Sequence, residues 1–174
     1  IKGMRFLCNT LCFFVVVFLF SSCGYHLSGY GSTLPPNIRT ISIPVFKNSS
    51  SEPNIQREVT DAVRRAFTSD GRLKVADAKK ADLLIQGTLT DYQLRAVAFN
   101  SEDSVAEYIV RIGVQITAYN RIKKKIIFDQ KFTNQWNYRA TASLVDSQLE
   151  RLSALREAYE DLADTLVSIT IEQF

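Results

Sequence analysis

Two sets of side chains in this 174-residue sequence could carry out chemistry: one cysteine near the start and one basic cluster. The only histidine, His26, lies three residues after Cys23 in a stretch rich in Gly and Ser. Catalysis by a Cys-His or Ser-His-Asp arrangement needs a histidine held in fixed geometry, which a stretch of this composition does not provide. Phosphate-binding glycine loops, HExxH motifs and clusters of His and Cys are also missing from the sequence. We therefore expect a protein that is not an enzyme and binds no metal or cofactor.

The first 22 residues have the pattern of a secretory signal peptide. Ten residues without a charge, Leu11–Phe20, follow Lys2 and Arg5. This run is half of the roughly 20 residues that a membrane-spanning helix needs, and it has no polar face for a core helix. A basic start, a short apolar run and small residues after it are typical of a cleaved signal. We predict that residues 1–22 are removed, together with Cys8 and Cys12.

Cys23 would then be the only cysteine, so it could form no intramolecular disulfide. Ser21 and Ser22 place small residues directly before it, as a lipoprotein signal peptidase requires, although Phe20 replaces the usual leucine. We predict that Cys23 is the lipid attachment site, because several buried acyl chains make a stable membrane anchor. Gly24 after the cysteine favours the outer membrane, and residues 23–36 read as a lipidated tether.

The basic cluster is Arg121, Lys123, Lys124 and Lys125, within a run that joins two predicted strands. It suits an anionic headgroup, since clustered bases bind phosphates through charge-assisted hydrogen bonds. The alternative is a solvated turn, because lysines commonly keep sheet edges soluble. Loss of Lys2 and Arg5 would leave 19 basic residues against 18 acidic ones, which argues against a nucleic-acid-binding protein.

The elements that position these residues follow from hydrophobic periodicity. Period-two alternation is clearest over 108–119, where one face is apolar. Residues 54–69 and 147–172 have helical spacing, and the second carries an apolar stripe that includes Leu149 and Leu152. Further strands are predicted over 38–44, 73–76, 83–97 and 126–136, with Gly87 marking a bulge or a close backbone approach.

Two amphipathic helices each need an apolar surface to cover, and a sheet with one apolar face provides it. The sequence therefore predicts a single α+β domain over residues 37–174. Its architecture would be a two-layer sandwich, with two helices on one face of a mostly antiparallel four- to five-stranded sheet. Most aromatic residues of the sheet would be core or cross-strand pairs, and any on the helix-free face could contact a partner.

Three stretches together resemble the LPS-assembly lipoprotein (LptE) family. They are CGYHL at Cys23–Leu27, the segment from Leu34-Pro35 to Ile43-Pro44, and the Ala106-Glu107-Tyr108 entry to the alternating strand. The resemblance implies a plug in the lumen of the outer-membrane β-barrel LptD, which helps the barrel assemble and binds lipopolysaccharide. By analogy, the basic cluster would contact lipid A phosphates.

An alternative class remains open at this stage. The stretches IPVFKNSS and ADLLIQGTLTDY also look like envelope lipoproteins of the CsgG or LpoB type. Those are secretion-pore subunits or activators of peptidoglycan synthases. The CGYHL opening and the hairpin after Ala106 favour the LptE family.

Overall fold

The computed structural model describes residues 34–141 and 143–172. The predicted signal peptide, Cys23 and His26 lie outside these residues, so their predicted roles stay predictions. No helix in the described part of the chain combines the length and apolar character needed to cross a membrane.

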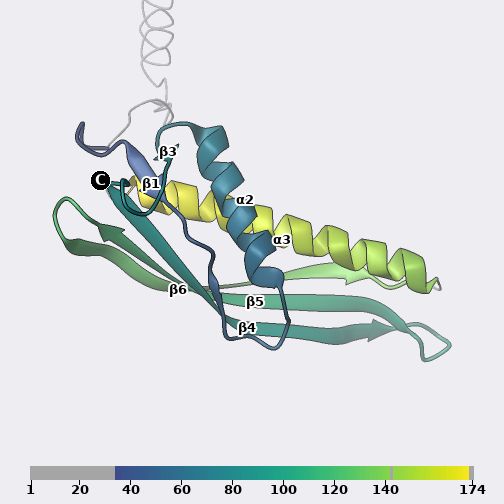
Figure 1. The fold of residues 1–174 in the computed structure, drawn as a ribbon. Coiled ribbons are helices and arrows are strands. Elements are labelled where there is room, and N and C mark those ends of the chain that lie inside the picture. Colours follow the sequence, from purple (N-terminus) through teal and green to yellow (C-terminus); the bar gives the residue numbers. More distant parts are fainter. Residues whose placement is uncertain (1–33, 142, 173–174) are drawn as a thin grey trace, which may run out of the picture. The chain divides into compact units, whose positions relative to one another are not determined.

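Two helices cover one face of a mixed sheet, as the sequence predicts (Figure 1). The described residues contain six strands, five of them in the order β3-β1-β4-β5-β6, with β2 also paired to β4. The elements are β1 (Thr40–Ser42), β2 (Lys47–Asn48), α2 (Ile55–Asp70), β3 (Lys74–Val75), β4 (Leu83–Phe99), β5 (Val105–Asn120), β6 (Lys125–Arg139) and α3 (Leu144–Glu172).

The three long strands β4, β5 and β6 form an antiparallel meander. Leu83 of β4 pairs with Asn120 of β5, and Tyr108 of β5 pairs with Tyr138 of β6. In this register, one side-chain face of all three strands points towards the helices. The register of the β4–β5 ladder shifts between Leu89 and Asp91 and twice more between Ala96 and Phe99, and not at Gly87. The predicted alternation along β5 is confirmed, because Val110, Ile112, Val114 and Ile116 are buried on one face of the strand.

Gly87 is instead a close approach, the second of the two expected roles. A Cβ atom at this position would lie about 2.6 Å from the ring of Phe46, which is itself buried. Since carbon atoms cannot approach this closely, the aromatic ring occupies the place of a side chain and closes the core above β4.

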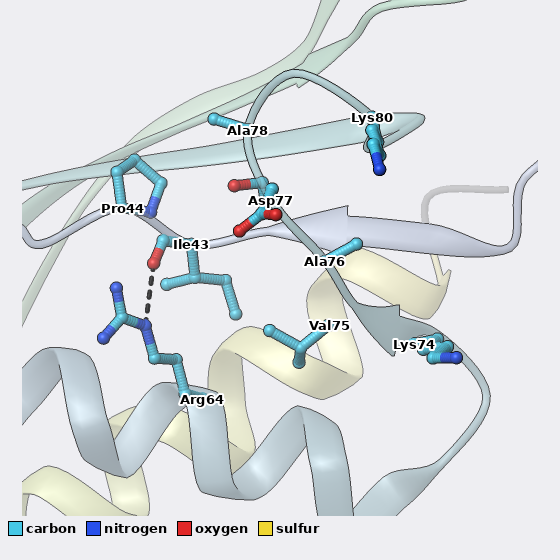
Figure 2. Close-up of a pocket in the computed structure, with 10 residues that line it drawn as sticks. Ile43, Pro44, Arg64, Lys74, Val75, Ala76, Asp77, Ala78 and Lys80 are labelled. Carbon is cyan, nitrogen blue, oxygen red and sulfur yellow. Dashed lines mark hydrogen bonds between the residues drawn. The ribbon is translucent and has the colours of Figure 1, made fainter.

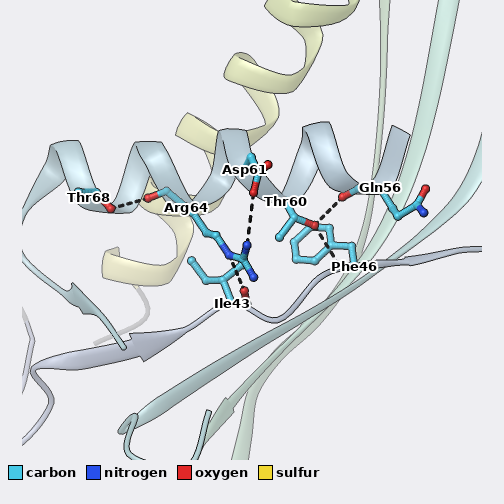
Figure 3. A network of polar contacts seen from close by, with 7 residues as sticks. All are labelled: Ile43, Phe46, Gln56, Thr60, Asp61, Arg64 and Thr68. Carbon is cyan, nitrogen blue, oxygen red and sulfur yellow. Dashed lines mark hydrogen bonds and ion pairs between the residues drawn. The ribbon is translucent and has the colours of Figure 1, made fainter. Parts of the chain in front are cut away.

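The first edge of the sheet is parallel, which the sequence pattern did not reveal. β1 pairs with both β3 and β4, and β2 pairs with β4 further along, so the edge is interrupted over residues 43–46. Helix α2 supplies the hydrogen bonds that this interruption leaves open (Figure 3). Thr60 Oγ1 accepts the Phe46 N–H at 2.9 Å, and Arg64 Nε donates to the Ile43 carbonyl at 2.9 Å.

Helix α3 covers the meander with a buried stripe formed by Leu155, Leu162 and Leu166. The prediction of one continuous stripe is wrong for the first turns, because Leu149 and Leu152 are 60% and 50% exposed. At 3.6 residues per turn, Leu149 points about a third of a turn away from Leu155. The turns before Ala154 therefore carry apolar side chains that the domain itself does not cover.

Candidate functional site

The four predicted basic residues lie together in the turn between β5 and β6. We call Arg121, Lys123, Lys124 and Lys125 the basic tip; all four are exposed. Asn120 shapes the turn, because its Oδ1 accepts the Lys123 N–H at 2.8 Å, and Lys124 has a φ of 52°. Within the described residues the ion pairs involve other cations, so the four charges of the tip are not neutralised by a carboxylate partner.

Asp82 connects the basic tip to the start of β1. Its backbone carbonyl accepts the Arg121 N–H at 2.9 Å. Its carboxylate accepts the backbone N–H groups of Arg39 at 3.0 Å and Thr40 at 2.9 Å, and the Thr40 hydroxyl at 2.7 Å. Burial raises the pKa of Asp82, but the hydrogen bonds from Arg39 and Thr40 outweigh it, so the pKa lies below its ordinary value.

Replacement Asp82→Asn is expected to lower the free energy of unfolding at pH 7 by about 1 kcal/mol, because hydrogen bonds to a charged acceptor are lost. The lowered pKa means that the ionised carboxylate stabilises the fold above the unfolded-state value of about 3.9. That stability is lost as pH falls through the folded-state pKa. Urea unfolding at pH 7 and pH 3 should therefore show the wild type and variant converging in acid. A difference that stays constant between these pH values would contradict this account.

A hollow of about 590 Å³ lies beside β1, β3 and α2 (Figure 2). Its charged lining residues are Arg64, Lys74, Asp77 and Lys80. The Arg64 guanidinium is already engaged by the Ile43 carbonyl and by Asp61 at 3.3 Å. The lining holds neither histidine nor cysteine, and among the described residues no cluster of His, Cys, Asp or Glu could hold a metal ion.

The helix-free face of the sheet is polar. Its outward residues on β5 and β6 include Arg111, Gln115, Thr117 and Asp129, and the Thr117 hydroxyl donates to Asp129 at 3.1 Å. Aromatic side chains mostly point to the other face, where Tyr108 stacks on Tyr138 with ring centroids 5.3 Å apart. Cross-strand pairing of aromatics is thus confirmed, whereas a row of aromatics on the helix-free face is not formed.

The exposed apolar residues at the start of α3 form a surface that sequence reasoning missed. We call Leu144, Val145, Leu149 and Leu152 the distal apolar surface, because it lies at the opposite end of the sheet from the basic tip (Figure 1). Monomeric soluble proteins rarely expose so many large apolar side chains together. The available signal was the position of Leu149, which lies about a third of a turn around the helix from Leu155.

Arg151 fixes the position of this part of α3. One guanidinium nitrogen donates to Glu52 Oε1 and to the Tyr92 hydroxyl, both at 2.8 Å. The hydrogen bond with Tyr92 is the main cause of an Arg151 pKa above its ordinary value, with Glu52 adding to it. Arg151 therefore ties α3 to the loop before α2 and to β4 by polar contacts, while the neighbouring Leu149 and Leu152 stay exposed.

Fold and surfaces together define a small α+β assembly domain: two helices over a meander with a parallel edge, a cationic hairpin and an uncovered apolar helix face. The chain belongs to the LptE lipopolysaccharide-assembly family, which matches residues 38–168. This is a non-catalytic family of lipopolysaccharide-assembly lipoproteins of the cell envelope, in agreement with the expectation that the chain is not an enzyme.

Solved structures share this fold at low sequence identity. A rare lipoprotein B from Shewanella oneidensis is 18% identical, with a TM-score of 0.52 over 72% of this chain and 92% of that one. A minor lipoprotein from Acinetobacter baumannii is 15% identical, with a TM-score of 0.51 over 79% and 92%. Protein XCC0632 from Xanthomonas campestris is 13% identical, with a TM-score of 0.55 over 82% and 90%. A search of curated proteins found no match to this sequence.

Proposed function

We propose that this chain is an outer-membrane lipoprotein, anchored through Cys23, that binds and plugs the β-barrel LptD. In this role it assists assembly of the barrel and delivery of lipopolysaccharide to the outer leaflet. The observation that carries the proposal is the family match, which extends from the first strand into the last helix. The same match favours this function over that of a CsgG- or LpoB-type lipoprotein.

Two surfaces support a barrel as the partner. The helix-free face of the sheet presents polar side chains, which suit the polar interior of a large outer-membrane barrel. The distal apolar surface leaves leucines exposed that a protein partner would bury. The polar sheet face and the distal apolar surface would both find partners in a wide barrel lumen with a mixed lining, whereas in free solution the apolar surface would stay exposed.

Co-purification from detergent-solubilised outer membranes tests the proposed partner. We expect the affinity-tagged protein to recover a large β-barrel protein in roughly equal amount. Recovery of a penicillin-binding protein, or of a ring made only of this chain, would reject LptD as the partner and support the CsgG or LpoB alternative.

We further propose that the basic tip contacts the phosphates of lipopolysaccharide. Replacing Arg121, Lys123, Lys124 and Lys125 with Ser should weaken lipopolysaccharide binding about ten-fold, because four exposed charge pairs of about 0.4 kcal/mol each sum to about 1.5 kcal/mol. The salt dependence of binding should decrease as well, since fewer charges are screened.

A matched control removes four exposed cations elsewhere: Arg57, Arg65, Lys131 and Arg156, each replaced by Ser. Both variants have the same net charge, so a difference in affinity reports position and not overall charge. Equal affinities for the two variants would show that the tip assignment is wrong.

A further inference from the structure

The basic tip is one part of a larger cationic end of the domain. Arg39 directly precedes β1, Lys74 lies beside it in β3, and Lys79 and Lys80 precede β4; all four are exposed. Ladder pairs and hydrogen bonds hold these segments together with the basic tip. We call these four residues and the basic tip together the cationic end.

Acidic residues are few in the segments that carry these cations. In residues 34–43, 72–82 and 119–126 they are Asp77 and Asp82, and Asp82 is already engaged by Arg39 and Thr40. The opposite hairpin has the reverse composition, because Asn100–Ser104 contains Glu102 and Asp103 and no Lys or Arg. The cationic end and the acidic hairpin lie at opposite ends of β4. This strand has 17 residues, so it is about 55 Å long. The domain is therefore strongly polarised along its sheet.

Two isoleucines beside the lysines distinguish this end from a merely solvated turn. Ile122, within the turn, is 47% exposed, and Ile126, opposite Tyr119 in the ladder, is 55% exposed. A solvated turn needs lysines but gains nothing from exposed isoleucines. Apolar side chains flanked by Lys and Arg are typical of segments that lie in the interface of an anionic bilayer.

The path of the chain indicates which end of the domain lies near the membrane leaflet that would hold the lipid anchor. The described domain begins at Leu34, and the Pro35 carbonyl accepts the Ile38 N–H directly before Arg39 of the cationic end. Even fully extended, the chain from Cys23 to Leu34 reaches only about 40 Å. Figure 1 shows the start of β1 and the β5–β6 turn at the same end of the sheet. A lipid anchor at Cys23 would keep this end within about 40 Å of the membrane, whereas the acidic hairpin lies about 55 Å further along the sheet.

We infer that the cationic end docks on the anionic phospholipid headgroups of the leaflet that holds the lipid anchor, with Ile122 and Ile126 entering the interface. This inference rests on the anchor at Cys23 proposed above. Docking orients the long axis of the sheet away from the membrane surface, so the distal apolar surface and the acidic hairpin point away from the anchored leaflet.

Quenching of tryptophan fluorescence by brominated lipids tests this orientation. The full lipoprotein, with lipidation of Cys23 verified by mass spectrometry, is placed in vesicles of phosphatidylcholine and phosphatidylglycerol that contain no lipopolysaccharide. The reporters are Ile122→Trp and, as matched control at the far hairpin, Ser101→Trp. Trp136 is replaced by Phe in both, or is kept as a background common to both if Trp136→Phe unfolds the domain.

We expect at least two-fold stronger quenching at position 122 than at position 101. The difference should fall in 0.5 M salt, in phosphatidylcholine alone and in a Lys79→Ser/Lys80→Ser variant, whose substitutions leave the basic tip intact. Equal quenching of the two reporters, or quenching that ignores lipid charge, would overturn the inference.

The outcomes separate this inference from the proposed function. Quenching at position 122 only after lipopolysaccharide is added would reject docking on phospholipid and support the tip as a lipopolysaccharide site. Charge-dependent quenching without recovery of a barrel in the co-purification would reject the LptD partner and leave the docking intact.

Discussion

The double substitution Leu149→Asp/Leu152→Asp is expected to abolish co-purification of the barrel partner while the domain stays folded. Both side chains are at least half exposed, so their replacement removes no core packing. Asp is a poorer helix former than Leu, and the stability cost should stay near 1 kcal/mol. At an interface, however, two buried charges without partners cost several kcal/mol, which is enough to lose the complex.

The matched control adds the same two charges away from this surface. Ser69→Asp/Ser168→Asp changes two exposed polar positions, one in α2 and one in α3, and should retain the barrel. Co-purification and thermal unfolding are measured on both variants. Full recovery of the barrel by the leucine variant, or equal loss with both variants, would show that the distal apolar surface is not the contact.

The substitution Gly87→Ala is expected to destabilise the domain by about 2–3 kcal/mol, the range of a clash in a packed core. The new Cβ would overlap the Phe46 ring, and Phe46 cannot easily move because Thr60 Oγ1 holds its backbone N–H. Chemical denaturation measures the loss. Gly113→Ala is a control in the same sheet, where the nearest atom, Asp91 Cβ, lies 3.0 Å away and the expected loss is smaller.

A double-mutant cycle with Phe46→Leu tests the proposed cause. The smaller side chain should create room for the methyl group, so Gly87→Ala should cost less in the Phe46→Leu background than in the wild type. Additive effects of the two substitutions would contradict a direct clash between residues 46 and 87.

The long elements could be predicted from the sequence because each is amphipathic over many residues. Alternation along β5 and helical spacing in α2 place these elements to within a few residues of their observed ends. The helices on one face follow from the same pattern, since the apolar side of the meander needs a cover. α3 begins three residues before its predicted start, because Leu144–Asp146 continue the helix without covering any apolar surface.

β1 and β3 lie within the strands predicted over 38–44 and 73–76, but β2 and the parallel pairing could not be predicted, because segments of two or three residues carry no periodicity. β1 and β2 are defined by partners in β4 and by the hydrogen bonds from Thr60 and Arg64, all of which are distant in sequence. The basic tip was predicted from its charge and from its position between two predicted strands. Its connection to Arg39 through Asp82 depends on tertiary contacts that no local pattern reports.

The position of α3 after the meander in the chain bears on the order of folding. Its residues from Ala154 to Ile171 cover the apolar face of the meander, and until they are present that face stays open to water. The core therefore cannot close before α3 is available. The same architecture leaves the uncovered meander vulnerable to aggregation in the interval, so a holding chaperone should bind the chain most strongly when α3 is deleted.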